Sequence, residues 1–481
     1  MQGNPRTLVN EKSLSGHLQI AQLPGPPGLP LVGNLLQLST EKLHQIFEQW
    51  SEQYGPIYKI KLGSRPVVIL TGPESIQYVL KNRPEKFRRL AKMDDVMREV
   101  GVVGIFNSEG EDWKRQRKLV SQALNVTHLK TFFPDMVNIT ANLLNRWNRL
   151  SGDDSSIEIK SELMRFTVDV TSRLAFGYNM NTIGKEEDVI QQHLEVIFPA
   201  LFTRTNNPVP YWRFFKLPAD RKLEKSLSVI QETMLGIINQ TRAQLLANPG
   251  LKHQPSNFLQ ALLAASESEN PVSNQLIIGN VLTLLLAGED TTAHSLAWIF
   301  YFMHLHPGVQ KKMRLEADRV LGNDTILRSY DDADKLSYIE AVALEAMRMK
   351  PVAPVLFFDA LEDVLLEGVD IPKGTAVFLE THYAGKKAEH FSDPDNFIPE
   401  RWMHGGCPAH SAHNERAFVP FGGGPRFCPG YKLAMLEITS VLVMVCKNFE
   451  VKMETSPAYV NEILAFTMMP SDFTIRLIKR G

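Results

Sequence analysis

Along most of the chain, apolar residues recur with the period of an α-helix, and strand-like alternation is confined to short stretches. An early amphipathic helix is predicted by the i, i+3, i+4, i+7 spacing of Leu43, Ile46, Phe47 and Trp50. Apolar residues at 58, 60 and 62 then alternate with lysines, and Gly63 and Ser64 lead into a second apolar run at 67–70, which predicts a β-hairpin. Helical periodicity dominates from about residue 75 to about residue 350.

The later part of the chain alternates long helices with extended segments. Helices are predicted at 275–304, 338–349 and 433–446, and prolines within 206–212 end one helix before another begins near Ala219. Extended segments are expected at 351–358 and 376–379. The whole pattern predicts a mainly α fold with small β-sheets.

Composition supports one large domain. The 481 residues are 44% hydrophobic, and no linker, long charge block or internal repeat divides them. We therefore expect a single domain at 23–481, preceded by a flexible extension at 1–22. The formal net charge of −1 argues against nucleic acid as the main partner.

The sequence offers no obvious membrane anchor. Residues 1–21 are polar throughout and lack the apolar run of a signal peptide. The longest apolar candidate, 281–288, is ended by Glu289 and Asp290, which leaves it too short for a membrane span. The three cysteines do not form a disulfide framework. These observations predict a soluble, cytoplasmic protein without an integral membrane segment.

The candidate chemistry centres on the loop at 421–430, Phe-Gly-Gly-Gly-Pro-Arg-Phe-Cys-Pro-Gly. Its glycines and prolines exclude a regular helix or strand, so it is predicted to be a shaped turn that presents Cys428. Cysteine binds metal as the thiolate, and Arg426 can supply positive charge beside it. Cys407 shares the Cys-Pro step but lacks the upstream Phe, Gly and Arg.

The spacing Phe-x-x-Gly-x-Arg-x-Cys-x-Gly resembles the haem-ligand loop of the cytochrome P450 family. The resemblance implies a single triangular domain in which Cys428 is the axial thiolate of a haem b iron. It also implies that the loop residues which bind the cofactor are Phe421, Gly424, Arg426 and Gly430.

Further motifs extend the resemblance to the haem propionates. Trp113 and Arg117 lie four residues apart on a predicted helix, and the family uses such a pair to bind a propionate. Many members carry Arg or His where this chain has Phe358, and His-Arg-Asp-Pro where it has 385–388. We therefore expect Trp113, Arg117 and Arg426 to bind the propionates without a further basic residue, or Lys386 to contribute to that binding.

The segment Ala-Gly-Glu-Asp-Thr-Thr at 287–292 has a low helix propensity, although it lies inside a long predicted helix. It is similar to the oxygen-binding groove of the family, in which Ala287 and the following glycine leave space above the iron. The resemblance makes Thr291 the hydrogen-bond partner of dioxygen and Asp290 the proton relay, since proton delivery is a positioned acid–base task. Glu289 is expected to face away.

A third motif pair concerns the fold. Glu345 and Arg348 lie three apart on a predicted helix, and Pro-Glu-Arg-Trp follows at 399–402. The family pairs such residues in a buried cluster, so Glu345, Arg348 and Arg401 are expected to lock the cysteine side of the molecule.

The resemblance implies a haem-thiolate monooxygenase that inserts one atom of dioxygen into an organic substrate. Candidate pocket residues are mostly apolar, which favours a lipophilic small molecule: Leu284, Ala287, Val352, Leu356 and Phe466. Electrons would come from a separate ferredoxin or flavin reductase. Two alternatives stay open: a haem-thiolate enzyme that uses peroxide or rearranges a hydroperoxide, and a non-catalytic haem carrier or sensor.

Overall fold

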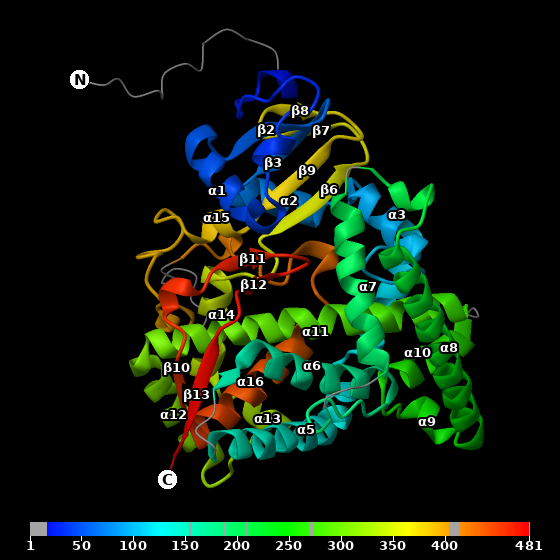
Figure 1. Ribbon diagram of the computed structural model, residues 1–481, viewed down its shortest axis with the longest axis vertical. Helices are drawn as coiled ribbons and strands as arrows, with labels where there is room; N and C mark the ends of the chain where they lie inside the picture. Colours follow the sequence, from blue (N-terminus) through cyan, green and yellow to red (C-terminus); the bar gives the residue numbers. More distant parts are fainter. Residues whose placement is uncertain are drawn as a thin grey trace.

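The computed structural model of the protein describes residues 17–152, 156–185, 189–207, 209–269, 273–403 and 413–480. The outline is roughly triangular, with the main β-sheet towards one corner and the helices filling the broad opposite side (Figure 1). The predicted mainly α fold with small sheets is confirmed.

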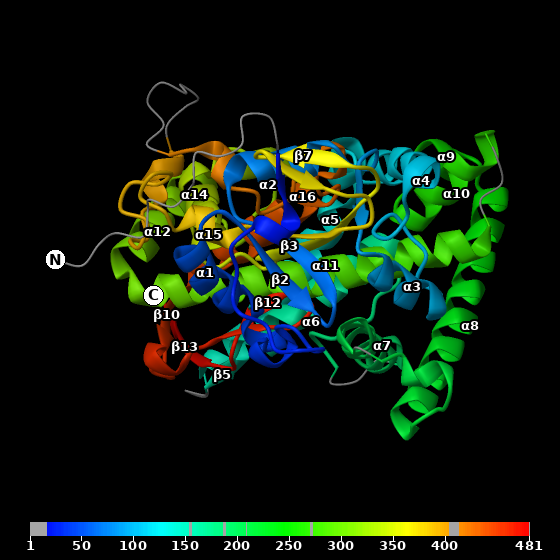
Figure 2. The same ribbon diagram turned by 90° about the horizontal axis from the view of Figure 1, so that it is seen from above.

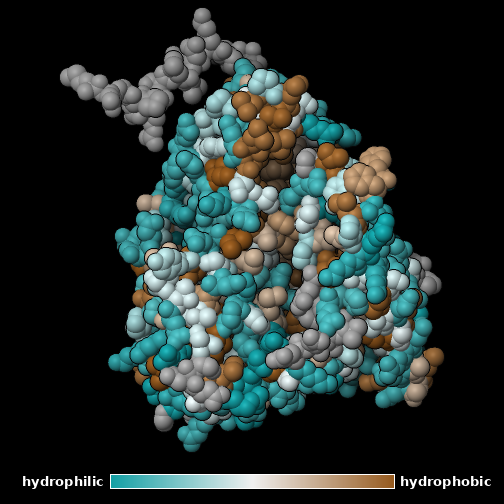
Figure 3. Space-filling model, viewed as in Figure 1, coloured by the Kyte–Doolittle hydropathy of each residue, from teal (hydrophilic) through white to brown (hydrophobic). Residues whose placement is uncertain are grey.

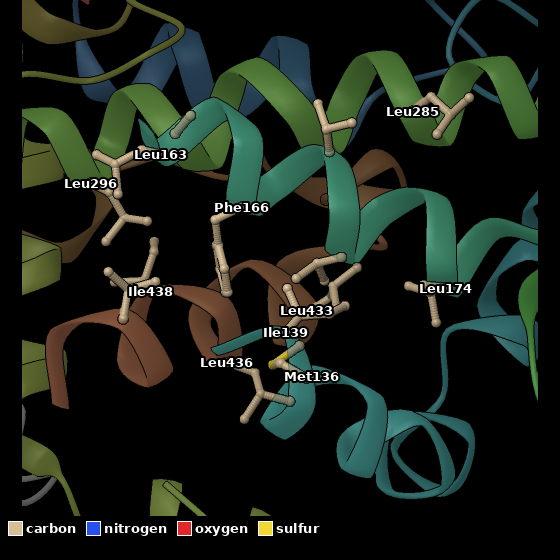
Figure 4. Close-up of a cluster of buried hydrophobic side chains, with 14 of the residues drawn as sticks. Met136, Ile139, Leu163, Phe166, Leu174, Leu285, Leu296, Leu433, Leu436 and Ile438 are labelled. Carbon is tan, nitrogen blue, oxygen red and sulfur yellow. The ribbon is translucent and has the colours of Figure 1, made fainter. Parts of the chain in front are cut away.

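The helical part is built around α11 (Asn274–Leu305), which crosses the middle of the molecule in both views (Figures 1 and 2). It packs against α6 (Ile159–Phe176), and both lie over α5 (Val126–Gly152) and α16 (Tyr431–Asn448). Figure 4 shows the apolar side chains that these four helices bury together, among them Phe166, Leu285 and Ile438. By length and composition α11 could cross a membrane, and most of it is buried inside the protein, as in the core helix of a globular domain.

The remaining helices surround this core or connect it to the sheets. Their bounds are α1 (Leu43–Tyr54), α2 (Pro73–Lys81), α3 (Ala91–Glu99), α4 (Gly110–Ala123), α7 (Val189–Asn206), α8 (Pro218–Ala247), α9 (Gly250–His253), α10 (Phe258–Glu269), α12 (Pro307–Leu321), α13 (Tyr330–Ala333), α14 (Ser337–Met349) and α15 (His382–Gly385). The helices predicted from apolar spacing near residues 43, 275, 338 and 433 all form.

The largest sheet has the strand order β2-β3-β9-β6-β4. Its strands are β2 (Ile57–Leu62), β3 (Arg65–Leu70), β9 (Ala376–Glu380), β6 (Val355–Ala360) and β4 (Phe87–Arg89). The predicted hairpin is β2 and β3, which pair antiparallel with Ile57 opposite Leu70. Its apolar residues point into two cores, one on each face of the sheet.

Three smaller sheets complete the fold. Their strands, in spatial order, are β1 (Leu18–Gln19), β8 (Val369–Ile371) and β7 (Val364–Leu366); β10 (Phe449–Met453), β13 (Thr474–Lys479) and β5 (Ile157–Glu158); and β11 (Glu462–Leu464) with β12 (Met468–Pro470). Within the expected N-terminal extension, Leu18–Gln19 pairs with β8, while residues 1–16 lie outside the described part of the chain.

Candidate functional site

The cysteine loop is held in one shape by its backbone. The Cys428 N–H donates to the carbonyl of Phe421 at 3.0 Å, which closes the turn. Gly424 has φ +63°, and a Cβ there would collide with the backbone of Leu80 on α2. The loop therefore needs glycine at this position, both for the left-handed backbone and for its close approach to α2.

Cys428 lies just before the N-terminus of α16, where backbone amides face its sulfur. The N–H groups of Gly430 and Tyr431, and the positive charge of Arg117, lower the pKa of the thiol. Burial opposes them and is the larger effect, so the pKa of Cys428 is raised overall. The loop alone does not make a thiolate, but a bound metal ion would supply the missing positive charge.

The other cysteines do not compete for this role. Cys446 is fully buried in the core on α16, where burial raises its pKa to about 12. Cys407 lies outside the described residues. Aromatic rings pack beside the Cys428 loop: Phe421 meets Tyr431 edge-on, with 4.8 Å between ring centroids.

A group of buried cations lies beside the cysteine loop. The guanidinium of Arg426 sits 4.6 Å from the centre of the Trp113 ring, and Arg426 also binds Glu109 and the carbonyl of Ser108. Arg83 is 3.6 Å from the same Glu109 and is only 4% exposed. Burial, with repulsion from its neighbouring arginines, lowers the pKa of Arg83 to about 8.

This group fits a bound dianion. Buried Nε and Nη2 of Arg83 and Nε of Arg426 find no hydrogen-bond partner within the described structure. Buried guanidinium donors without acceptors are unfavourable, so an acidic ligand beside them would be strongly stabilised. Carboxylates of a flat cofactor whose metal is bound by Cys428 would meet this need, as the propionates of a haem do.

Sequence reasoning missed Arg83. This arginine can replace the basic residue that many cytochromes P450 carry where this chain has Phe358. The Arg83 guanidinium lies 4.3 Å from the centre of the Phe358 ring, so a cation from another segment occupies the place next to the missing basic residue. In the sequence, Arg83 is only a single arginine before Pro84, and no motif marks it as a cofactor ligand. The alternative suggested from sequence, Lys386, instead pairs with Glu48 at 2.8 Å.

One face of α11 is open along the otherwise buried middle of the helix. Leu284, Ala287 and Thr291 are spaced i, i+3, i+7 and keep exposed surface, whereas most neighbouring residues are buried. The Thr291 hydroxyl donates to the carbonyl of Ala287 at 2.6 Å and keeps its lone pairs free to accept a bond. Ala287 and Thr291 of the sequence motif thus share this partly exposed face of the helix.

Gly288 serves a different purpose from the one inferred from sequence. A Cβ on Gly288 would overlap the Cγ2 methyl of Thr171 on α6, so the missing side chain lets α6 pack closely against α11. The Cβ position of Gly288 is thus directed at α6, whereas Ala287 lies on the open face.

Acidic residues on α11 differ in their surroundings. Burial raises the pKa of Asp290 to about 6, and Lys160 opposes the shift only weakly. Glu289 is buried on another side of the helix. Sequence reasoning missed Glu437 of α16, a fully buried carboxyl whose pKa burial raises to about 8 despite a hydrogen bond with Thr292.

The predicted pocket residues come from different elements but share partial burial. Val352, Leu356 and Phe466 each keep some exposed surface, as Leu284 does. Phe106, which the sequence did not single out, lies 6.0 Å from Phe466 between ring centroids, and the guanidinium of Arg89 lies 3.6 Å from the centre of the Phe106 ring. Phe106 thus contacts both a predicted pocket residue, Phe466, and an arginine close to the cationic group.

Glu345, Arg348 and Arg401 form the buried cluster that the motifs suggested. Arg348 donates to both oxygens of Glu345 at 2.8 and 3.0 Å, and Arg401 donates to Glu345 at 3.1 Å. The Trp402 indole adds a further bond at 2.8 Å. This network ties α14 to the segment that leads into the cysteine loop.

Comparisons with known proteins agree with this geometry. A family model described as Cytochrome P450 matches residues 23–477. Cytochrome P450 4d1 of Drosophila simulans is 30% identical over 95% of this chain and 93% of its own length. Carotene epsilon-monooxygenase, chloroplastic, of Arabidopsis thaliana is 26% identical over 93% and 83%.

Among solved structures, the cytochrome P450DA heme domain superposes with a TM-score of 0.84 at 24% identity, covering 95% of this chain and 98% of its own. That likeness shows the fold, and the family model and the fly relative show the family. The chain is therefore a haem b-binding, haem-thiolate monooxygenase of the cytochrome P450 family.

Proposed function

We propose that this protein inserts one oxygen atom into a lipophilic small molecule, with Cys428 as the iron ligand. The observation that carries the proposal is the pairing of a thiol facing backbone amides with unsatisfied, buried guanidinium donors of Arg83 and Arg426. When bound, haem supplies the activation of dioxygen. The chain's own residues hold the cofactor, position the substrate and handle protons.

Trp113, Arg83, Arg117 and Arg426 are proposed to bind the propionates. Phe421, Gly424 and Gly430 keep the cysteine loop in shape. Above the opposite face, the half-buried Leu284, Val352, Leu356 and Phe466, together with Phe106, would surround the substrate and exclude water. Their apolar character favours hydroxylation or epoxidation of a hydrophobic substrate.

Asp290 and Thr291 are proposed to deliver protons. A carboxyl with a pKa of about 6 exchanges protons readily near neutral pH, because it is populated in both forms. Thr291 lies on the open face, and its hydroxyl could accept a proton from Asp290 through a water molecule and release its own proton into the space above that face. The relay would determine the coupling efficiency, that is, the amount of product formed per electron pair consumed.

The test compares Asp290→Asn and Thr291→Ala with Thr292→Ala, whose hydroxyl lies towards Glu437. With a reductase, the first two variants are expected to form at least tenfold less product per electron pair and to release more peroxide. Peroxide-driven turnover should change less, since peroxide brings its own protons. Equal loss in all three variants would contradict the relay.

The same assay separates the alternative functions. An enzyme that only uses peroxide would turn over without a reductase, and the relay variants would behave like wild type. A carrier or sensor would bind apolar ligands with a spectral shift but form no product with either oxidant. Reductase-dependent product formation is the expected result.

A separate ferredoxin or flavin reductase is proposed as the electron donor. Lys114 and Arg115 are exposed on α4, on the same helix as Trp113, and pair with exposed acids: Lys114 with Glu111 and Glu85, and Arg115 with Asp112. Exposed pairs of this kind contribute little to stability and can exchange for an acidic partner. Lys114→Glu with Arg115→Glu should slow reduction and weaken its dependence on salt.

The cytoplasmic location stays a prediction. Exposed apolar residues lie near the sheet end and the segment before α8, among them Leu31, Leu36 and Phe214, and Figure 3 shows apolar surface gathered near the sheet end. Sedimentation with phospholipid vesicles distinguishes a dissolved protein from one that associates with membranes. We expect the protein to remain in the supernatant.

A further inference from the structure

A second cluster of potential metal ligands lies apart from the haem site. Glu48 comes from α1, Glu380 ends β9 and His382 begins α15, and Figures 1 and 2 both place α1 beside α15. One ligand atom from each residue lies within 4.8 Å of the other two. The cluster shares no residue with the proposed haem and substrate contacts.

His382 is oriented like a metal-binding histidine. Its Nε2 lies 2.7 Å from the carbonyl of Met349, so Nε2 must carry the proton and donate it. Metal-binding histidines are usually held this way, with the second ring nitrogen donating to a backbone carbonyl. The other nitrogen, Nδ1, is left as a lone pair that points into the cluster.

That lone pair has no satisfactory partner in the described structure. The His382 side chain is 1% exposed, and its Nδ1 lies 2.7 Å from Oε1 of Glu48 without the alignment of a hydrogen bond. Oε1 of Glu48 also has no hydrogen-bond partner among the described residues. When the His382 ring is neutral these are two buried acceptors that repel, and either a proton on Nδ1 or a cation bound between them relieves the contact.

Both carboxylates are positioned by outer contacts. Glu380 is fully buried and accepts the backbone N–H groups of His382 and Tyr383 at 3.1 and 2.8 Å. Glu48 uses its second oxygen to accept from Lys386 at 2.8 Å. Such outer hydrogen bonds orient carboxylate ligands in metal sites.

The charges of the cluster do not balance. Glu48 and Glu380 bring two negative charges, and Lys386 is a cation in direct contact with Glu48. Glu380 is fully buried and lies within the same cluster as the like charge of Glu48, so this excess is unfavourable. Either a proton on Glu380 or a bound cation relieves it.

We propose that Glu48, Glu380 and His382 bind one divalent transition-metal ion, of which Zn²⁺ is the best match. Imidazole with carboxylates is a typical zinc donor set. Donors bound tetrahedrally to one ion at about 2.1 Å lie about 3.4 Å apart, so the Glu48 oxygen must withdraw from its 2.7 Å contact with His382 by about 0.7 Å. Glu48 is the most exposed of the three and can make this movement.

The ion would act as a structural clamp. It would join α1 to the end of β9 and to α15, which in turn contacts the C-terminus of α14 through His382 and Met349. Binding to the folded state alone stabilises it in proportion to the logarithm of metal concentration over Kd. Zinc is therefore expected to raise the unfolding temperature of the haem-loaded protein.

The test uses haem-loaded protein stripped of other metals with a chelator and then dialysed against ZnCl2. We expect one zinc per haem, and at least tenfold weaker binding in Glu380→Gln and in His382→Gln. His390→Gln is the matched control, because His390 is a neighbouring histidine whose acidic contact is the exposed Glu389. Lys386→Gln removes the cation that competes for Glu48 and should bind zinc at least as tightly.

X-ray absorption at the zinc edge adds a second readout. The proposal requires a first shell of nitrogen and oxygen without sulfur, which also separates this site from the cysteines. If Glu380→Gln loses its haem spectrum, the half-buried Glu48→Gln replaces it. The proposal is overturned if wild type binds no zinc, if the ligand variants bind as tightly as His390→Gln, or if sulfur coordinates the ion.

Discussion

The assignment of Gly288 to helix packing makes a prediction that the oxygen-groove interpretation does not. Gly288→Ala gains about 1 kcal/mol of helix propensity. It also places a methyl group against Cγ2 of Thr171, a fully buried side chain whose hydroxyl is bonded to the carbonyl of Thr167. Overpacking of this kind costs about 1–3 kcal/mol, so we expect the variant to lose up to about 2 kcal/mol.

The partner substitution Thr171→Ser removes the clashing methyl and keeps the hydroxyl. In that background Gly288→Ala should be neutral or stabilising, which corresponds to a coupling of about 1–3 kcal/mol between the two sites. Gly236→Ala on α8 is the matched control, because its Cβ would meet no atom within 4 Å. It should gain about 1 kcal/mol from helix propensity alone.

Urea unfolding of the haem-loaded proteins, followed by circular dichroism, measures these stabilities, and carbon monoxide rebinding after flash photolysis reports access to the iron. We expect Gly288→Ala to rebind carbon monoxide as wild type does. Slower rebinding, together with a coupling below about 0.5 kcal/mol between Gly288→Ala and Thr171→Ser, would refute the packing role. Such a result would support the interpretation that Gly288 leaves space in the oxygen groove.

Three further predictions concern buried charges. Arg83→Met removes buried donors that are proposed to bind a haem propionate, so the transfer of haem to apomyoglobin should be at least fivefold faster than in wild type. Arg88→Met is the control, because Arg88 pairs with Asp94, and its rate of haem transfer should not change. Glu345→Gln leaves two buried arginines undercompensated and should lower the free energy of unfolding by about 3–5 kcal/mol in the same urea assay; a loss under 1 kcal/mol would contradict the network. Burial holds the pKa of Glu437 at about 8 in the folded protein, above its ordinary value of 4.5, so Glu437 ionises in the unfolded state first as the pH rises. The free energy of unfolding should therefore fall by on the order of 5 kcal/mol between about pH 5 and pH 8. Glu437→Gln should flatten this pH profile.

Local patterns predicted much of the fold and part of the site. The glycine and proline content of 421–430 was enough to predict a shaped turn around Cys428, and apolar spacing placed α11, α14 and α16. In these segments the structure depends on neighbours in sequence. The conformation of Gly424, with φ +63°, is one such local property.

The remaining features depend on contacts between distant segments. Nothing near Arg83 in sequence indicates that its guanidinium stacks on Phe358. Likewise, whether Gly288 faces the pocket or α6 is decided by Thr171, more than a hundred residues earlier. The Glu48–Glu380–His382 cluster brings α1 to α15 across most of the chain, so no spacing rule could have found it.

The central claim is thiolate ligation by Cys428, and the absorption spectrum of the reduced, carbon-monoxide-bound protein tests it most directly. Wild type and Cys446→Ser should both give a strongly red-shifted Soret band, because Cys446 is buried in the core away from the loop. Cys428→Ser should lose that band. A histidine-type Soret band in wild type, or a red-shifted band that survives in Cys428→Ser, would contradict the account.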